Sequence, residues 1–263
     1  MADEFRLDGA VAVVTGALGN LGPVWVGALA GAGATVVGID LRPPDELELA
    51  ESNATVLYEQ ADVTDRPGLE ELRARVEAQV GPATVLVNNA GIDQPPGADA
   101  RTSLIEDVPL EDFKRTLDVN LGGTFNATQV FGPGMTRLGG GSIVNIGSLY
   151  ASVAAEPRFY DHMDADPPFL KPPAYGASKA AVVNLTRYFA RLWGPHGVRV
   201  NALSPGGVLG GQDAEFLAKY TARVPLGRMA DAGDLAGPIL FLASDASRYL
   251  TGHELRVDGG FTA

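Results

Sequence analysis

The stretch VAVVTGALGNLG, residues 11–22, joins a short apolar run to a cluster of glycines. Its first five residues are small, apolar or β-branched, as expected of a strand that is buried on both faces. The glycines allow a tight turn, and residues 22–32 have the small and apolar composition of a helix. Because unpaired N–H groups at the start of a helix bind phosphate, this strand, turn and helix predict a dinucleotide site.

A second predicted strand, residues 35–40, ends in Asp40, about 20 residues after the turn. An acid at this place accepts a hydrogen bond from a ribose 2′-hydroxyl and repels a 2′-phosphate. We therefore expect NAD as the cofactor. NADP stays the alternative because the nearby Arg42 could accept that phosphate.

Strand-like and helix-like segments alternate along the remaining chain. Strands are predicted at 56–63, 84–91, 141–148, 198–205 and 253–260, and helices at 67–80, 110–131, 174–193 and 231–244. This alternation predicts an α/β, Rossmann-type, doubly wound fold with a seven-stranded, mostly parallel sheet and helices on both faces.

No linker divides residues 1–263, so we expect a single dinucleotide-binding domain. Two long segments, 149–173 and 206–225, follow strands at the predicted carboxyl edge of the sheet, where such folds bind ligands. Long irregular segments in compact domains are usually functional, so we expect an active-site lid at 149–173 and a substrate loop at 206–225.

The composition excludes several classes of protein. The net charge is −12, which argues against nucleic-acid partners and against anionic membrane surfaces. The absence of cysteine excludes disulfides and zinc sites built on thiolates. The first ten residues are acidic and carry no apolar stretch, so we expect no signal peptide and a cytoplasmic protein.

A tyrosine and a lysine stand four residues apart at the start of the predicted helix 174–193. Tyr175 and Lys179 therefore share one face of that helix. An ammonium close to a phenol lowers its pKa and makes it usable as an acid or base near neutrality. Ser148 ends a predicted strand and could hydrogen-bond a substrate oxygen. Each residue alone could equally be structural.

Taken together, these motifs resemble the short-chain dehydrogenase/reductase family. The resemblance spans nearly the whole chain and includes ADV at 61–63, NNAG at 88–91, VNLGG at 119–123 and VDGG at 257–260. It implies hydride transfer between a nicotinamide and a secondary alcohol or ketone. By this resemblance the catalytic residues are Ser148, which polarises the substrate oxygen, Tyr175 as acid/base, Lys179 on the nicotinamide ribose, and Asn120, which anchors a water in a proton relay.

The resemblance also implies a set of cofactor-binding residues. They are Gly16, Gly19, Asn20, Leu21, Gly22, Asp40, Asp62, Val63, Asn89, Ala90, Gly91, Tyr175, Lys179, Pro205, Gly206 and Val208. Family members often form tetramers, so we expect a homo-oligomer, either a tetramer or a dimer.

The sequence departs from the family pattern in three places. The turn carries Gly19 and Asn20 in a spacing typical of extended members, many of which are nucleotide-sugar epimerases or dehydratases. The gap from Ser148 to Tyr175 is unusually long; Tyr160 has the usual distance, but Asp164 stands where its lysine would be. Val208 lies near the place of a threonine that touches the cofactor amide in many members.

The insertion also bears on the substrate and on metal binding. His162 lies among acids in this segment, yet the ligand spacing is not distinctive, and we expect no metal. We expect an NAD-dependent oxidoreductase that acts on a small polar alcohol or carbonyl compound, such as a sugar, sugar acid or polyol. An epimerase or dehydratase and a non-catalytic dinucleotide sensor are the alternatives.

Overall fold

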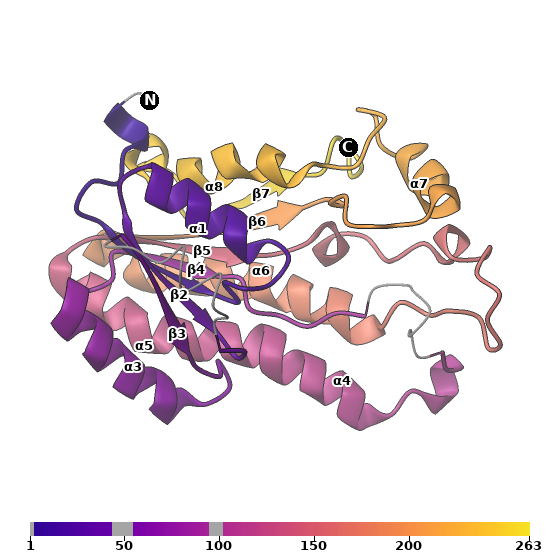
Figure 1. The fold of residues 1–263 in the computed structure, drawn as a ribbon, viewed down its shortest axis with the longest axis horizontal. Coiled ribbons are helices and arrows are strands. Elements are labelled where there is room, and N and C mark those ends of the chain that lie inside the picture. The colour runs from indigo at the N-terminus through magenta and orange to yellow at the C-terminus, as the bar shows by residue number, and fades with distance from the viewer. Residues whose placement is uncertain (1–2, 44–54, 95–101) are drawn as a thin grey trace.

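The computed structural model describes residues 3–43, 55–94 and 102–263 (Figure 1). Seven strands form one sheet in the order β3-β2-β1-β4-β5-β6-β7, and every neighbouring pair is parallel. The strands are β1 (Val11–Thr15), β2 (Thr35–Asp40), β3 (Val56–Gln60), β4 (Val85–Asn88), β5 (Gly141–Ile146), β6 (Val198–Pro205) and β7 (Glu254–Val257).

Helices cover both faces of this sheet, which confirms the predicted Rossmann-type α/β fold. They are α1 (Gly22–Gly31), α3 (Arg66–Val80), α4 (Leu110–Leu117), α5 (Gly123–Leu138), α6 (Pro173–Trp193), α7 (Ala214–Thr221) and α8 (Ala236–Ala243). Figure 1 shows α1 and α8 on one side of the sheet and α3 and α5 on the other.

The alternation of side chains along β1 builds two cores at once. Ala12 and Val14 pack with Trp25 of α1 in one cluster, and Val13 packs with Phe131 of α5 in the other. All three β1 residues are completely buried. An unbroken apolar strand is therefore required here, because helices lie over both of its faces.

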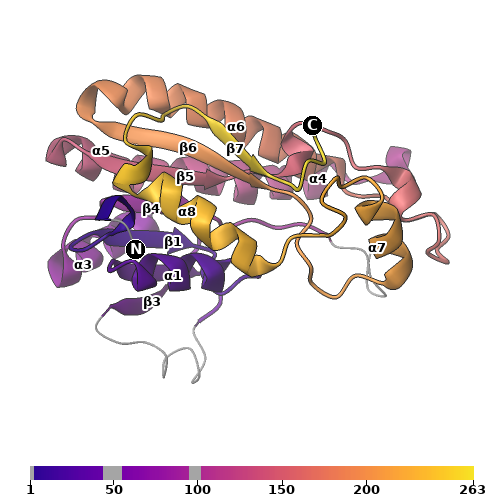
Figure 2. The same ribbon diagram turned by 90° about the horizontal axis from the view of Figure 1, so that it is seen from above.

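The crevice for a ligand follows from the strand order. From β1 the chain moves outward to β2 and β3, and then returns to the other side of β1 as β4. The connections that leave β1 and β4 therefore diverge at the carboxyl edge, where doubly wound folds bind ligands. Both α7 and residues 149–173 project beyond this edge (Figure 1; Figure 2).

The structure differs from the sequence prediction in two helical regions. The helix predicted at 110–131 is α4, a π-helical turn (Asp118–Gly122) and then α5, which continues past Pro133. The segment 206–225 contains α7, whose start is capped by Asp213 Oδ1, which accepts from the N–H groups of Glu215 and Phe216. Among the described residues, no helix is long and apolar enough to cross a membrane.

Candidate active site

The turn after β1 is shaped by glycines that tolerate no side chain. Gly16 has φ +64°, and a Cβ atom there would lie 2.7 Å from the Ala90 Cα. A Cβ atom on Gly22 would lie 2.2 Å from the Ala17 carbonyl oxygen. These two positions need glycine because the turn packs closely against the loop that follows β4 and bends back on its own backbone.

Thr15 and Asn89 bind the glycine turn to the loop that follows β4. The Thr15 hydroxyl accepts hydrogen bonds from the N–H groups of Asn89 and Ala90, each at 3.1 Å. The Asn89 amide donates to the Gly16 carbonyl at 2.8 Å, and its oxygen accepts from the Trp25 indole. Asn89 therefore holds the turn in shape in addition to the cofactor contact expected of it.

Asp40 lies beside the same turn. One of its oxygens accepts from the Leu18 N–H at 2.9 Å, and the other accepts from the Arg42 N–H at 3.1 Å. The Arg42 guanidinium donates to the Leu18 carbonyl at 3.3 Å. Asp40 and Arg42, on which the choice between NAD and NADP depends, therefore both contact the glycine turn.

A cavity of about 1490 Å³ runs along the carboxyl edge of the sheet. It is lined by Gly16, Gly19, Asn20, Leu21, Asp40, Asp62, Val63, Asn89, Ala90, Gly91, Ser148, Tyr175, Lys179, Pro205, Gly206 and Val208, all of which the sequence nominated. Two nominated residues, Gly22 and Asn120, do not line it. The cavity therefore extends continuously from the glycine turn and Asp40 to the tyrosine and lysine of α6.

Tyr175, Ser148 and Lys179 meet at one end of this cavity. Ser148 follows β5 and is 7% exposed, and its hydroxyl lies near enough to the Tyr175 phenol to lower the pKa of that phenol. The Tyr175 ring centroid lies 5.8 Å from the Lys179 Nζ. That ammonium donates to the Ile146 carbonyl at 2.8 Å. One helix and one strand end thus hold a hydroxyl, a phenol and an ammonium together.

The ionisation of this group differs from the sequence expectation. Burial, assisted by the negative charge of Asp93, raises the pKa of Tyr175, and the hydrogen bond from Ser148 only partly opposes this. Burial also lowers the pKa of Lys179 to about 8. The expected net lowering of the tyrosine pKa is therefore wrong, because desolvation of the phenolate dominates the pKa of Tyr175.

Asn120 lies behind the cavity wall, in the π-helical turn. Its side-chain oxygen accepts from the Ile92 N–H at 2.7 Å, and its amide donates to the Ile92 carbonyl and to the Ser178 hydroxyl, both at 3.0 Å. The side chain is completely buried. Asn120 therefore fixes the β4 loop against α6, and its part in a proton relay stays a prediction.

Tyr160, the other tyrosine that the spacing allowed, belongs to an aromatic cluster away from the cavity lining. Its ring lies 4.9 Å from that of Phe169 and 5.6 Å from that of Phe216. Phe159 packs 5.6 Å from Tyr220 of α7, measured between ring centroids. The insertion and α7 thus share one apolar core at the carboxyl edge.

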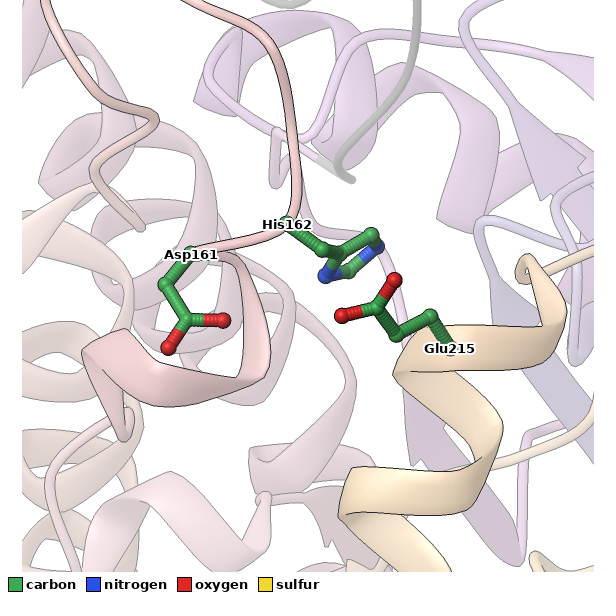
Figure 3. Close-up of side chains that lie close together, drawn as sticks. All are labelled: Asp161, His162 and Glu215. Carbon is green, nitrogen blue, oxygen red and sulfur yellow. The ribbon is translucent and has the colours of Figure 1, made fainter.

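A polar cluster ties the insertion to α7 on the outside of this core. His162 lies between Asp161 and Glu215 (Figure 3). One ring nitrogen of His162 and one carboxylate oxygen from each acid lie within 4.8 Å of one another, close enough to be considered as metal ligands. The Lys219 ammonium hydrogen-bonds Asp161, and it lies 2.8 Å from a Glu215 oxygen and 3.2 Å from His162 Nδ1. The ammonium therefore already supplies the positive charge that these acids attract.

The geometry defines a dinucleotide-binding α/β protein with a Ser-Tyr-Lys cluster, and comparison with known proteins identifies the family. A family model described as enoyl-(acyl carrier protein) reductase matches residues 16–262. The chain is 37% identical to galactitol 2-dehydrogenase of Rhizobium johnstonii, over 98% of this chain and 97% of that protein. The chain belongs to the short-chain dehydrogenase/reductase family, whose fold binds a nicotinamide cofactor.

Two solved structures superpose closely on this fold. A gluconate 5-dehydrogenase from Burkholderia cenocepacia, in complex with NADP and tartrate, has a TM-score of 0.83 and 30% identity, covering 99% of this chain and 98% of that one. A short chain dehydrogenase from Leptospira borgpetersenii with bound NAD+ has a TM-score of 0.85 and 34% identity, covering 99% and 95%. The protein is accordingly an oxidoreductase.

Sequence reasoning missed one charged pair at this site. Asp93 lines the cavity, and the Lys171 ammonium hydrogen-bonds its carboxylate. The only hint in the sequence was an acid two residues after the NNAG motif, since the lysine lies 78 positions away.

Proposed function

We propose that the protein is an NAD-dependent dehydrogenase that converts a secondary alcohol of a small polyol, sugar or sugar acid to the ketone. The observation that carries this proposal is the single cavity that joins Asp40 to Tyr175. The bound nicotinamide would accept the hydride from the carbinol carbon. Tyr175 would take the hydroxyl proton, so that one C–H and one O–H bond break as the C=O bond forms.

The remaining roles follow from the contacts of each side chain. Ser148 would hydrogen-bond the substrate oxygen, because its hydroxyl already meets the Tyr175 phenol. Lys179 would hold the nicotinamide ribose from the cavity wall. Asn120 would keep the loop after β4 in register with α6, as its hydrogen bonds to Ile92 and Ser178 support.

The preference for NAD is supported by the position of Asp40. Its carboxylate accepts from the Leu18 N–H of the glycine turn and lines the cavity. A 2′-phosphate there would meet a negative charge, whereas a ribose hydroxyl would meet an acceptor. Arg42 contacts the same turn but does not line the cavity, which supports the same preference.

Assembly and compartment complete the proposal. Phe125 of α5, and Tyr188 and Leu192 of α6, are 38%, 60% and 48% exposed, and these apolar surfaces support a homo-oligomer, either a tetramer or a dimer. The proposed compartment is the cytoplasm, which supplies a dissociable nicotinamide cofactor. Within a single domain, residues 149–173 would act as a lid and residues 206–225 as a substrate loop.

The test is a panel of polyols, sugars, sugar acids and cyclic alcohols, each assayed with NAD+ and with NADP+ by the absorbance of the reduced cofactor. We expect turnover of at least one polyhydroxylated compound, with NAD+ preferred. No turnover of any compound with either cofactor would overturn the proposed reaction. A preference for NADP+ would overturn the assignment of Asp40.

A further inference from the structure

Asp93 and Lys171 form an ion pair at the catalytic end of the cavity. Asp93 follows the β4 loop, and its Oδ2 accepts a hydrogen bond from the Lys171 ammonium. The same ammonium donates to the Gln94 carbonyl at 3.2 Å. Lys171 lies at the end of residues 149–173, immediately before α6. The pair therefore joins the β4 loop to the segment that leads into the catalytic helix.

This pair lies beside the proposed acid/base. The Lys171 Nζ is 5.4 Å from the centroid of the Tyr175 ring, slightly nearer than the Lys179 Nζ at 5.8 Å. The charge of Asp93 also reaches both catalytic groups, because it raises the pKa of Tyr175 and counteracts the lowering of the pKa of Lys179. A substrate bound at Tyr175 would therefore lie within the field of Asp93.

The two members of the pair are not equally open to a ligand. The Lys171 side chain is only 10% exposed and does not line the active-site cavity, whereas the Asp93 side chain is 31% exposed and does. Within the described residues, the hydrogen bond to the Asp93 carboxylate goes to Oδ2, and Oδ1 accepts none there. The cavity thus presents a carboxylate, with its counter-cation behind it.

A carboxylate in this place discriminates between two kinds of polar substrate. It accepts hydrogen bonds from neighbouring hydroxyl groups, and it repels another carboxylate. The charged residues of α4 and of the π-helical turn that line the cavity balance in formal charge and add no net attraction for an anion. They are Glu111, Lys114 and Arg115 of α4 and Asp118 of the π-helical turn.

We propose that Asp93, positioned by Lys171, makes this site select uncharged polyols and reject sugar acids. Asp93 is the specificity-determining residue, which accepts from substrate hydroxyls. Lys171 is a positioning residue, which holds Asp93 and does not contact the substrate. The inference rests on the proposed dehydrogenase function and narrows its substrate class.

The test compares matched alditol and aldonate pairs with four, five and six carbons. In the wild type, we expect kcat/KM for the preferred alditol to exceed that for its aldonate by on the order of 30-fold. Asp93→Asn, which keeps the shape and removes the charge, should lower this ratio about tenfold, largely by improving the aldonate. Lys171→Gln leaves Asp93 uncompensated and should not lower the ratio.

Asp112→Asn is the matched control, because Asp112 is an exposed acid of α4 outside the cavity lining. The ratio of kcat/KM for the alditol to that for the aldonate should be the same in this variant as in the wild type. A wild type that oxidises both members of a pair equally well, or a ratio unchanged in Asp93→Asn, would overturn the inference. Both results leave the dehydrogenase function intact.

A binding experiment tests the role of Asp93 independently of the proposed reaction. Ligand-observed NMR measures binding of the same pairs to Tyr175→Phe in the presence of NADH, which requires no turnover. Selective alditol binding, lost in the Asp93→Asn/Tyr175→Phe double variant, supports the role of Asp93 even if the wild type turns over neither compound. If no pair is bound or turned over, the inference about Asp93 is overturned, and the proposed reaction is then decided by the other compounds of the substrate panel.

Discussion

The buried ammonium of Lys179 makes the stability of the protein depend on pH in a predictable way. Its pKa of about 8 compares with 10.5 in the unfolded chain, so between these values the unfolded state binds more protons than the folded state. The contribution of Lys179 is therefore least favourable below pH 8 and improves as the pH rises towards 10.5. The difference between these two pKa values corresponds to about 3 kcal/mol.

Urea unfolding of the wild type and of Lys179→Met, measured from pH 7 to pH 10.5, tests this reasoning. The wild-type free energy of unfolding should gain about 3 kcal/mol relative to the variant across this window. Comparing the two proteins cancels the titration of other groups, and following the difference as the pH changes removes any constant cost of the substitution.

Lys219→Met is the control for this experiment. The Lys219 ammonium contacts Asp161 and Glu215, and hydrogen bonds to these acids raise the pKa of Lys219. Its stabilising contribution is therefore present throughout this pH window and is lost only above it, so the difference from the wild type should stay flat. A flat difference for Lys179→Met as well would refute the claim that burial lowers the pKa of Lys179.

Three further results are expected. Asp40→Ala should reduce the preference for NAD+ over NADP+ about tenfold or more, measured as the ratio of kcat/KM values; an unchanged ratio would place cofactor selection elsewhere. Because burial raises the pKa of Tyr175 and alcohol oxidation needs its unprotonated form, kcat/KM for oxidation should rise from pH 7 to pH 9, and a falling profile would contradict this. Phe159→Ala removes a ring that packs on Tyr220 and Phe261; it should cost about 3 kcal/mol and raise the substrate KM more than the Kd for NAD+, whereas equal changes would argue against a substrate-facing role of the insertion.

The sequence was sufficient for features set by local spacing. Tyr175 and Lys179 were predicted to share a helix face because they are four residues apart, and both line the cavity. The parallel, seven-stranded sheet follows from alternating strands and helices, since crossover connections keep neighbouring strands parallel. Tyr160 was rejected because Asp164 replaces its lysine, and its ring lies in the aromatic cluster.

Features that depend on depth or on distant contacts were not predictable. The direction of the Tyr175 pKa shift was wrong because the sequence does not reveal how thoroughly the phenol is desolvated. The pairing of Lys171 with Asp93 depends on the path of a 25-residue insertion, 149–173, which no periodicity describes. The helix α7 was missed because its cap, Asp213, follows a glycine-rich stretch that was interpreted as a loop.

The central claim is that Tyr175 transfers the proton in a hydride-transfer reaction with NAD. It is tested most directly by Tyr175→Phe, assayed on the best alcohol of the substrate panel, with NAD+ binding measured in parallel by calorimetry. The Phe variant keeps the ring of Tyr175 and removes its hydroxyl. We predict that turnover falls by about a thousandfold while the Kd for NAD+ changes little. Full activity in the variant would contradict the account.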